Sequence, residues 1–288
     1  MPSPMLSLRA AGSAAAAVVL ALSLAACSPA ERPKSVPTTS AESALPSAHV
    51  HGLSVGPDGK VLLATHDGLF DITKDPAVKV GPTIDLMGFT AAKERGTFYA
   101  SGHPGHGSTL PNPVGLIRST DGGATWEEVS RQGESDFHTL ATTRSGVIAF
   151  DGTLRTSPDG LAWDTVAAGF APATLAGHPD SDTILATTES GIQRSTDGGR
   201  TWTLQEGAPV AQFAAFASAS DAVGVEPSGA VHASSDGGAT WARKGKLEGR
   251  PMAVAATGSG DGLRIWAATS AGVFVSADGG ASFRPHGG

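Results

Sequence analysis

The chain has 288 residues, 16% of them charged, a formal net charge of −7 and a single cysteine. An acidic chain without a basic run argues against a nucleic-acid-binding protein, and one cysteine excludes an internal disulfide. The 240 residues from 49 to 288 suffice for one large domain, whose stability must come from core burial and closure of the fold.

The N-terminus has the features of an export signal. Arg9 is the only charged side chain before the apolar stretch 14–22, which leads into Leu24-Ala25-Ala26-Cys27. A positive charge, a short apolar core and small residues at the cleavage site are typical of a secretory signal peptide. The apolar run is too short for a membrane-spanning helix. The residues around Cys27 resemble the lipobox of bacterial lipoproteins.

This resemblance implies that residues 1–26 are removed and that Cys27 carries acyl chains. Such chains would hold the protein to the extracytoplasmic face of the cell membrane. The alternative is a plain signal peptide cut near the same site. Residues 28–48 contain little that can be buried, so we expect Cys27 and the linker that follows it (27–48) to be a flexible tether to the folded domain, 49–288.

One nine-residue motif recurs along the rest of the chain. RSTDGGATW (118–126), RSTDGGRTW (194–202) and ASSDGGATW (233–241) are nearly identical, VSADGGASF (275–283) is a fourth copy and TSPDGLAW (156–163) a degenerate fifth. The aspartates of the copies are Asp121, Asp159, Asp197, Asp236 and Asp278, at steps of 38, 38, 39 and 42 residues. The regular spacing indicates repeated structural units.

The motif has a structural explanation. A short aspartate side chain can accept hydrogen bonds from backbone N–H groups just downstream and fix a tight turn. The Gly-Gly pair tolerates the positive φ that such turns require, and the Trp or Phe that follows can be buried between neighbouring units. We therefore predict that the five aspartates stabilise the fold and are not catalytic.

The motif resembles the Asp-box, or BNR, repeat of sialidases, sortilin-type receptors and photosystem assembly factors, over residues 115–288. The resemblance implies an all-β fold, a β-propeller of four-stranded blades in which the box joins the third and fourth strands. Six units of about 40 residues, beginning near residues 49, 85, 136, 171, 210 and 250, fill the domain. The first unit has the strands but no Asp-box. A closed ring leaves few strand edges exposed.

In a propeller the first strand of each blade lines the central channel. Aligned first strands read HVHGL (49–53), DLMGF (85–89), DFHTL (136–140) and RPMAV (250–254). Because side chains two apart share a face of a strand, two columns face the channel. The first column contains His49, Asp85, Asp136 and Arg250, and the third contains His51, Met87, His138 and Met252. The fourth unit contributes Ala173, and the fifth, which aligns poorly, Ala211.

Connections between second and third strands share one rim with the start of each first strand. They add three further histidines and several acidic residues to that rim: His66, Asp67, His103, His106, Asp151 and Glu189. Six of the nine histidines of the chain therefore map to one rim, mostly on the first three units. The longest connection, 102–114, can cap it.

Imidazole and thioether donors together favour copper, with zinc as the second choice. We expect the ligands to be His51, Met87, His138 and Met252, with His49, His66, His103 and His106 nearby. His49, Asp85 or Asp136 would orient the ligands. The alternative is that the histidines bind ordered water and each other, and that the methionines fill space.

Two other function classes remain open. Asp85, Asp136 or Asp151 could serve as acid and base in a glycoside hydrolase. A sialidase is disfavoured because the only tyrosine, Tyr99, lies in an expected second strand, whereas sialidases use a tyrosine nucleophile. The third class is a scaffold that binds an envelope protein on the rim.

The sequence thus favours a monomeric, lipid-anchored propeller, non-hydrolytic, that binds a metal ion or a metal-dependent small ligand.

Overall fold

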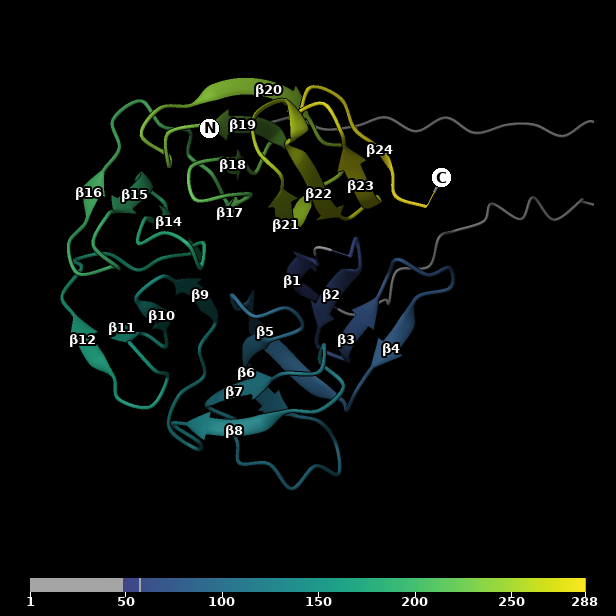
Figure 1. Cartoon of the computed structure of the whole chain (residues 1–288), viewed down its shortest axis with the longest axis vertical. Coiled ribbons are helices and arrows are strands. Elements are labelled where there is room, and N and C mark those ends of the chain that lie inside the picture. The colour runs from purple at the N-terminus through teal and green to yellow at the C-terminus, as the bar shows by residue number, and fades with distance from the viewer. Residues whose placement is uncertain (1–48, 57, 288) are drawn as a thin grey trace, which may run out of the picture. The chain divides into compact units, whose positions relative to one another are not determined.

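The computed structural model describes residues 49–56 and 58–287. The predicted signal peptide, Cys27 and the predicted linker lie outside the described residues. In the described part of the chain, no helix has the length and apolarity needed to cross a membrane. The described residues form six antiparallel sheets of four strands each, and in every sheet the strands are consecutive in sequence. The predicted six-bladed propeller is therefore confirmed (Figure 1).

The strands of the first three blades occupy the following ranges. Blade 1 contains β1 (Val50–Val55), β2 (Val61–Thr65), β3 (Gly68–Asp71) and β4 (Val78–Val80). Blade 2 contains β5 (Ile84–Ala91), β6 (Phe98–Pro104), β7 (Leu116–Ser119) and β8 (Glu127–Ser130). Blade 3 contains β9 (Thr139–Thr143), β10 (Gly146–Phe150), β11 (Leu154–Ser157) and β12 (Asp164–Val166).

The other three blades follow the same plan. Blade 4 contains β13 (Thr174–Ala176), β14 (Ile184–Thr188), β15 (Gly191–Ser195) and β16 (Thr203–Leu204). Blade 5 contains β17 (Phe213–Phe216), β18 (Ala222–Val225), β19 (Ala230–Ser234) and β20 (Ala242–Lys246). Blade 6 contains β21 (Pro251–Thr257), β22 (Arg264–Thr269), β23 (Gly272–Ser276) and β24 (Arg284–Pro285), with a 3-10 turn, η1 (Gly260–Gly262), between β21 and β22.

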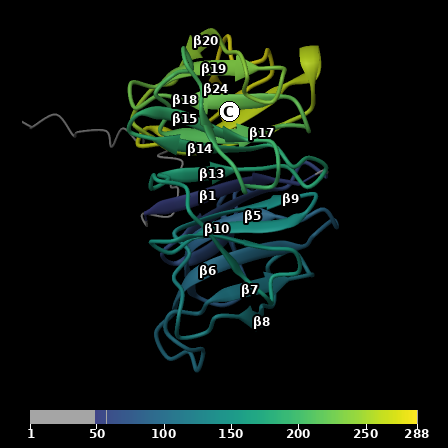
Figure 2. The same ribbon diagram turned by 90° about the vertical axis from the view of Figure 1, so that its left-hand side faces the viewer.

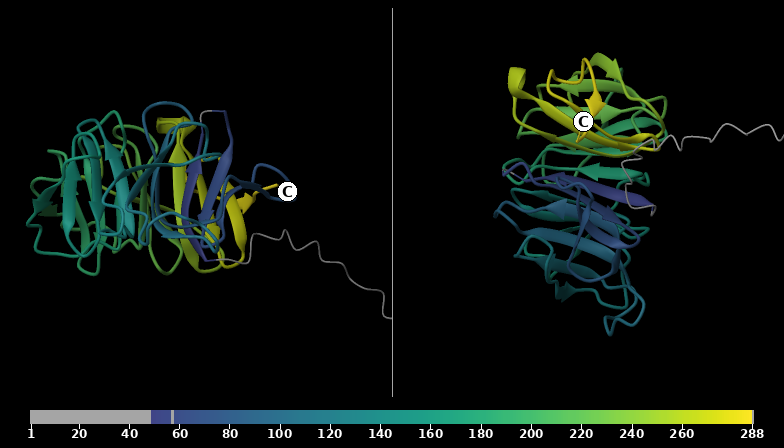
Figure 3. Two further views of the ribbon diagram at one scale, coloured as in Figure 1. Left: turned by 90° about the horizontal axis from the view of Figure 1, so that it is seen from below. Right: turned by 90° about the vertical axis from the view of Figure 1, so that its right-hand side faces the viewer.

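The first strands lie nearest the axis and the fourth strands on the outside, as Figure 1 shows for β5 and β8. Seen from the side, the blades are layers of roughly parallel ribbons (Figures 2 and 3). The middle strands carry the core because both of their faces are covered: every residue of β2 and β14 is buried. Strands covered on both faces and rich in apolar side chains are what a ring of face-to-face sheets requires.

Each boundary between blades has its own hydrophobic cluster, and at five of the six an Asp-box aromatic side chain packs against it. Trp126, Trp163, Trp202, Trp241 and Phe283 occupy these boundaries in chain order. The predicted position of the box aromatic between blades is confirmed, and each of these rings is partly buried. A single Trp also donates a hydrogen bond across a boundary, from Trp163 Nε1 to Ser130 Oγ at 2.9 Å.

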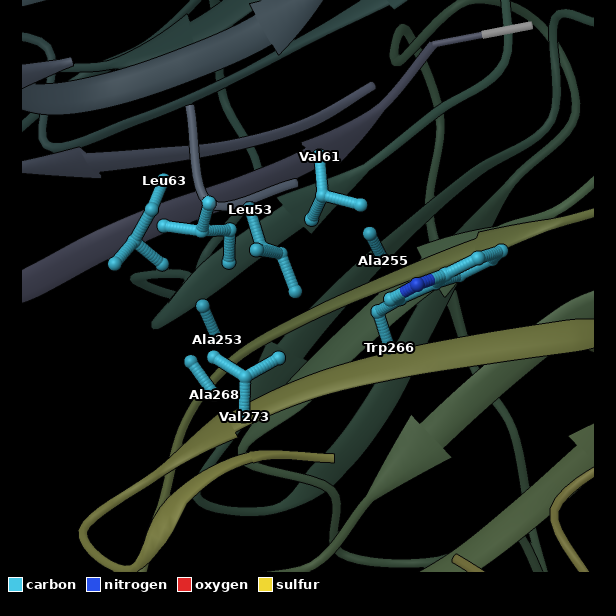
Figure 4. Close-up of a cluster of buried hydrophobic side chains, with 9 residues drawn as sticks. Leu53, Val61, Leu63, Ala253, Ala255, Trp266, Ala268 and Val273 are labelled. Carbon is cyan, nitrogen blue, oxygen red and sulfur yellow. The ribbon is translucent and has the colours of Figure 1, made fainter. Parts of the chain in front are cut away.

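The sixth boundary closes the ring between blades 6 and 1, and it lacks a box aromatic because blade 1 has no Asp-box. Trp266 of β22 fills this place and is only 8% exposed. It packs in one cluster with Leu53 and Leu63 of blade 1 (Figure 4). Since each sheet consists of consecutive strands, closure does not use a strand shared between the chain's two ends. In the described structure, side-chain packing and a contact of His286 Nε2 with the Ile72 carbonyl oxygen at 3.2 Å therefore hold the ring shut.

The Asp-box turns have the same hydrogen-bond pattern in four blades. In blade 4, Asp197 accepts bonds from Ser195 Oγ (2.8 Å), the Thr201 N–H (2.9 Å) and Thr201 Oγ1 (2.7 Å). In blade 2, the hydroxyl and N–H of Thr125 lower the pKa of Asp121 to about 2. The degenerate box of blade 3 is weaker, since Asp159 accepts its bonds from two backbone N–H groups and a longer one from Ser157 Oγ at 3.3 Å.

We expect Asp197→Ala to lower the free energy of unfolding by about 1–2 kcal/mol, because a capping carboxylate that satisfies local donors is lost. Urea unfolding followed by circular dichroism measures this. Asp159→Ala is the matched control and should have a smaller effect, because its box makes fewer bonds. An equal loss in both variants, or a change in ligand affinity in Asp197→Ala, would contradict the structural assignment.

Candidate metal site at the channel mouth

The four predicted ligands line one cavity of about 380 Å³ at one end of the central channel. We call it the channel cavity: His51, Met87, His138 and Met252 contribute to its wall, together with small and apolar residues such as Ala173, Leu175 and Ala214. A second cavity of about 310 Å³ continues the channel and is lined by the later residues of the first strands, among them Thr90, Thr142 and Thr257. The first strands therefore line the channel as the repeat alignment predicts. That these four residues bind metal stays a prediction.

Local backbone irregularity points three of these side chains into the cavity. The pairing of first and second strands skips His51 in blade 1, Met87 in blade 2 and Met252 in blade 6. Each is thus the extra residue of a β-bulge, a device that re-aims a side chain and is common beside functional sites. Gly88, directly after Met87, allows blade 2 to approach blade 3, since a Cβ there would lie 2.4 Å from the Phe137 carbonyl oxygen.

The other blades place different residues at the same position. The N–H groups of His138, Ala173 and Gln212 donate to the equivalent second-strand carbonyl oxygens of Phe150, Thr187 and Val225. Gln212, and not the expected Ala211, therefore occupies the third column in blade 5. Ala211 is 3% exposed and belongs to the core between blades 4 and 5. The sequence alignment was wrong by one residue because the first strand of blade 5 has no His, Met or Gly that marks its register.

Three donor groups of blades 1 and 2 converge at the mouth of the cavity. His51, His66 and Asp85 each offer one ligand atom, and these atoms lie within 4.8 Å of one another. Asp85 Oδ1 lies 2.7 Å from His66 Nδ1 and 3.8 Å from His51 Nε2. Asp85 Oδ1 and His51 Nε2 are both buried and have no hydrogen-bond partner among the described residues, so the 2.7 Å contact lacks hydrogen-bond geometry.

The imidazoles of this cluster are packed against each other. The rings of His51 and His66 meet edge to face with centroids 4.4 Å apart, and His49 lies 5.4 Å from His66. Burial, reinforced by the neighbouring His66, lowers the pKa of His51. A lowered pKa favours the neutral ring, in which one nitrogen keeps the lone pair that a metal ligand needs.

A second cluster lies at the next blade boundary. Asp136 Oδ2 is 3.2 Å from His103 Nε2 and 3.4 Å from His138 Nε2. The Nδ1 atoms of these two histidines lie near oxygen acceptors: His103 near Asn112 Oδ1 at 2.8 Å, and His138 near the Asp136 carbonyl oxygen at 3.1 Å. Asp136 Oδ1 is buried without a hydrogen-bond partner in the described structure.

Other residues singled out in the sequence lie apart from these clusters. Asp151 is enclosed by arginines, with Arg155 Nε at 3.1 Å and Arg131 at 3.8 Å, and Ser135 Oγ donates to it at 2.6 Å. Burial alone would raise the pKa of Asp151, but the bonds from Ser135 and Arg155 outweigh burial and lower it. A carboxylate held in this way is suited to bracing blade 3.

Two more predictions about position can be compared with the structure. His106 is exposed in a turn of the long blade 2 connection and is not part of either cluster. Tyr99 lies in β6, the second strand of its blade, and packs against the core between blades 2 and 3, as expected.

The role of the carboxylates is where sequence reasoning fell short. We expected Asp85 and Asp136 to orient ligands from behind, whereas the structure puts Asp85 in direct convergence with His51 and His66. The sequence placed His66 near the expected ligands but not among them. The alternation of side chains along the first strand predicted His51. The contact between His66 and Asp85 crosses a blade boundary, so the sequence of neither blade alone predicts it.

The fold and repeats can be compared with known proteins. The BNR/Asp-box repeat model matches residues 193–204. Of the solved structures, the GH74 enzyme of Niastella koreensis has a TM-score of 0.58 and 18% identity, covering 83% of this chain and 37% of that chain. The GH74 xyloglucanase from Xanthomonas campestris has a TM-score of 0.56 and 16% identity, covering 83% and 38%. YCF48 bound to D1 peptide has a TM-score of 0.53 and 15% identity, covering 83% and 82%.

These similarities show the fold alone. The chain spans less than two fifths of the length of the two GH74 enzymes. A comparison with curated protein sequences gave no significant match. The box motifs, the repeat-model match and the six four-stranded sheets together identify this chain as a six-bladed β-propeller that contains BNR/Asp-box repeats.

Proposed function

We propose that this protein is an exported, lipid-anchored propeller that binds a transition-metal ion at the mouth of its channel, through His51, His66 and Asp85. The observation that carries the proposal is the convergence of two imidazoles and a carboxylate whose buried Nε2 and Oδ1 atoms lack hydrogen-bond partners in the described structure. Buried polar atoms without partners are costly, and a bound cation would satisfy both. The anchor is proposed from the lipobox at Cys27.

The donor set suits a borderline divalent ion. Imidazole and carboxylate ligands bind zinc at about 2.0–2.2 Å, so a tetrahedral site brings donor atoms to about 3.4 Å from each other. The 2.7 Å contact of Asp85 with His66 must therefore lengthen by about 0.7 Å and the 3.8 Å contact with His51 must shorten by about 0.4 Å. The 43% exposed side chain of His66 leaves room for that movement. Because a given site usually binds Cu²⁺ more tightly than Zn²⁺, we propose copper as the preferred ion and zinc as the second choice.

The metal content of the purified protein tests this proposal. The full chain, without a His-tag, is purified in detergent after growth with added copper or zinc, and metal is measured by mass spectrometry. We expect bound metal in the wild-type protein and one metal ion fewer per chain in His51→Gln, which removes a buried donor. His106→Gln, an exposed histidine outside the cluster, is the matched control. Metal-free wild-type protein after supplementation would refute the proposal.

A glycoside hydrolase is the second candidate. The observation in its favour is that Asp85 and Asp136, at the same position of neighbouring blades, both lie at the channel mouth beside histidines. Carboxylates facing one substrate can act as acid and base. Hydrolysis of chromogenic glycosides that is abolished by Asp136→Asn and indifferent to chelators would favour this candidate over the metal site.

A further inference from the structure

The contact between histidine and aspartate at the channel mouth occurs twice, at successive blade boundaries. Asp85, at the start of blade 2, lies 2.7 Å from His66 at the end of the second strand of blade 1. Asp136, at the start of blade 3, lies 3.2 Å from His103 at the end of the second strand of blade 2. The two pairs therefore occupy equivalent positions, one blade apart around the ring.

Strand pairing establishes that these positions are equivalent. His103 pairs with Asp85 in the ladder between β5 and β6, and the N–H of His66 donates to the carbonyl of His49, the residue that corresponds to Asp85 in blade 1. Met87 in blade 2 is the equivalent of His51 in blade 1, since both are the extra residue of a bulge in the first strand. The second cluster thus has a thioether where the first has an imidazole, and it gains His138 from blade 3.

The hydrogen bonds of the second cluster fix the protonation of its histidines. An amide oxygen and a peptide oxygen can only accept hydrogen bonds, so Nδ1 of His103 and Nδ1 of His138 carry the protons. In the neutral rings both Nε2 lone pairs then face Asp136 Oδ2, at 3.2 and 3.4 Å. Each lone pair at such a distance repels the carboxylate oxygen unless a cation lies between them. The two Nε2 atoms are more than 4.8 Å apart, because among the described residues only the first cluster has three donor atoms that all lie within 4.8 Å of one another.

Two kinds of cation can meet this need: protons on the imidazoles or a metal ion. The arrangement favours a metal, because histidine ligands characteristically donate the other ring N–H to an oxygen that orients them. Asp136 Oδ1, buried and without a partner in the described residues, offers a further donor atom. Exposed His138 (60%) and His103 (41%) are free to close around an ion.

We propose that His103, Asp136, His138 and Met87 form a second metal site on the channel rim, which takes copper in preference to zinc. The thioether makes the set softer than that of the first site, and thioethers add little to zinc affinity. The second site shares no ligand with the first, so each can be present without the other. Its two imidazoles and carboxylate match the donors of the first site, so the second site can also bind zinc, and its thioether sets the preference for copper.

Copper and zinc titrations of the tag-free full chain in detergent test this inference. Copper is added as copper(I) kept reduced with ascorbate, and the bound metal is counted after removal of free ions against a competing chelator. We expect two copper ions per wild-type chain, and copper should displace zinc from the second site when the two metals compete. Asp136→Asn and His103→Gln should each retain one copper, and Met87→Leu should weaken the second copper at least tenfold. His106→Gln, from the same connection as His103, should retain two.

The outcomes separate this inference from the first proposal. One copper ion per wild-type chain, or two copper ions per chain of Asp136→Asn, would overturn the second site. The imidazoles of that cluster would then be protonated instead of metal-bound. If Asp85→Asn keeps both coppers, the first site fails while this one stands. Unchanged copper affinity in Met87→Leu would overturn the preference for copper.

Discussion

Asp85→Asn should weaken metal binding at the His51–His66–Asp85 cluster by more than about 100-fold, since loss even of an orienting partner costs 10–100-fold. The change keeps the shape of the side chain but removes the only negative charge among the three donors. The remaining histidines would still offer two nitrogen donors, without the charge that neutralises a divalent ion. Competition against a chromogenic chelator measures the affinity.

Asp67→Asn is the matched control for this experiment. Asp67 is an exposed carboxylate directly after His66, on the same rim, but it is not one of the three converging groups. We expect the metal affinity of Asp67→Asn to stay within about threefold of that of the wild type, because exposed charges are screened. Equal losses in both variants would mean that the rim attracts metal by its general charge and would contradict a built site.

The fold of Asp85→Asn should be at least as stable as that of the wild type. Asp85 Oδ1 is a buried charged atom without a hydrogen-bond partner in the described structure, and an amide costs less to bury than a carboxylate. A melting temperature that is unchanged or higher, measured without metal, would therefore accompany the lost affinity. This combination separates a ligand from a residue that merely supports the fold.

Trp266→Ala should lower the free energy of unfolding by about 3–5 kcal/mol, because it empties a large aromatic volume from a packed core. The melting temperature should fall by roughly 10 °C, given the size of the domain. The effect should be large because Trp266 is the buried aromatic side chain of the closing boundary, where blade 1 supplies no box aromatic. Calorimetry or urea unfolding followed by circular dichroism measures the loss.

Two variants make this prediction specific. Trp266→Phe should recover most of the stability, since the ring of phenylalanine still fills much of the space. Leu161→Ala, at a side chain that is 62% exposed, should change the free energy by less than about 0.5 kcal/mol. A loss below 1 kcal/mol in Trp266→Ala would show that the closing boundary contributes little to the ring.

Much of the fold could be predicted from the sequence because it rests on local interactions repeated along the chain. Each Asp-box satisfies its own donors within four residues, as Asp197 does with Ser195 and Thr201, so the motif and its turn are found together. The period of the boxes then gave the number of blades. The alternation of the first strands placed His51 and Met87 correctly on one cavity.

The contacts between blades could not be read in the same way. The distance from Asp85 to His66 depends on how two blades meet around the ring, and bulges at His51 and Met87 shift the side chains by an amount that strand alternation does not encode. The use of Trp266 to close the ring is likewise a property of the assembled blades, since nothing near this residue repeats the box.

The amino-acid sequence by itself therefore determined the repeat, the blade and the face of each first-strand residue, because hydrogen bonds over a few residues and a fixed period specify them. Only the tertiary structure decided which donors converge and what closes the ring. Those features arise where blades from distant parts of the chain meet, and their geometry is set by packing across the boundary and not by either segment alone.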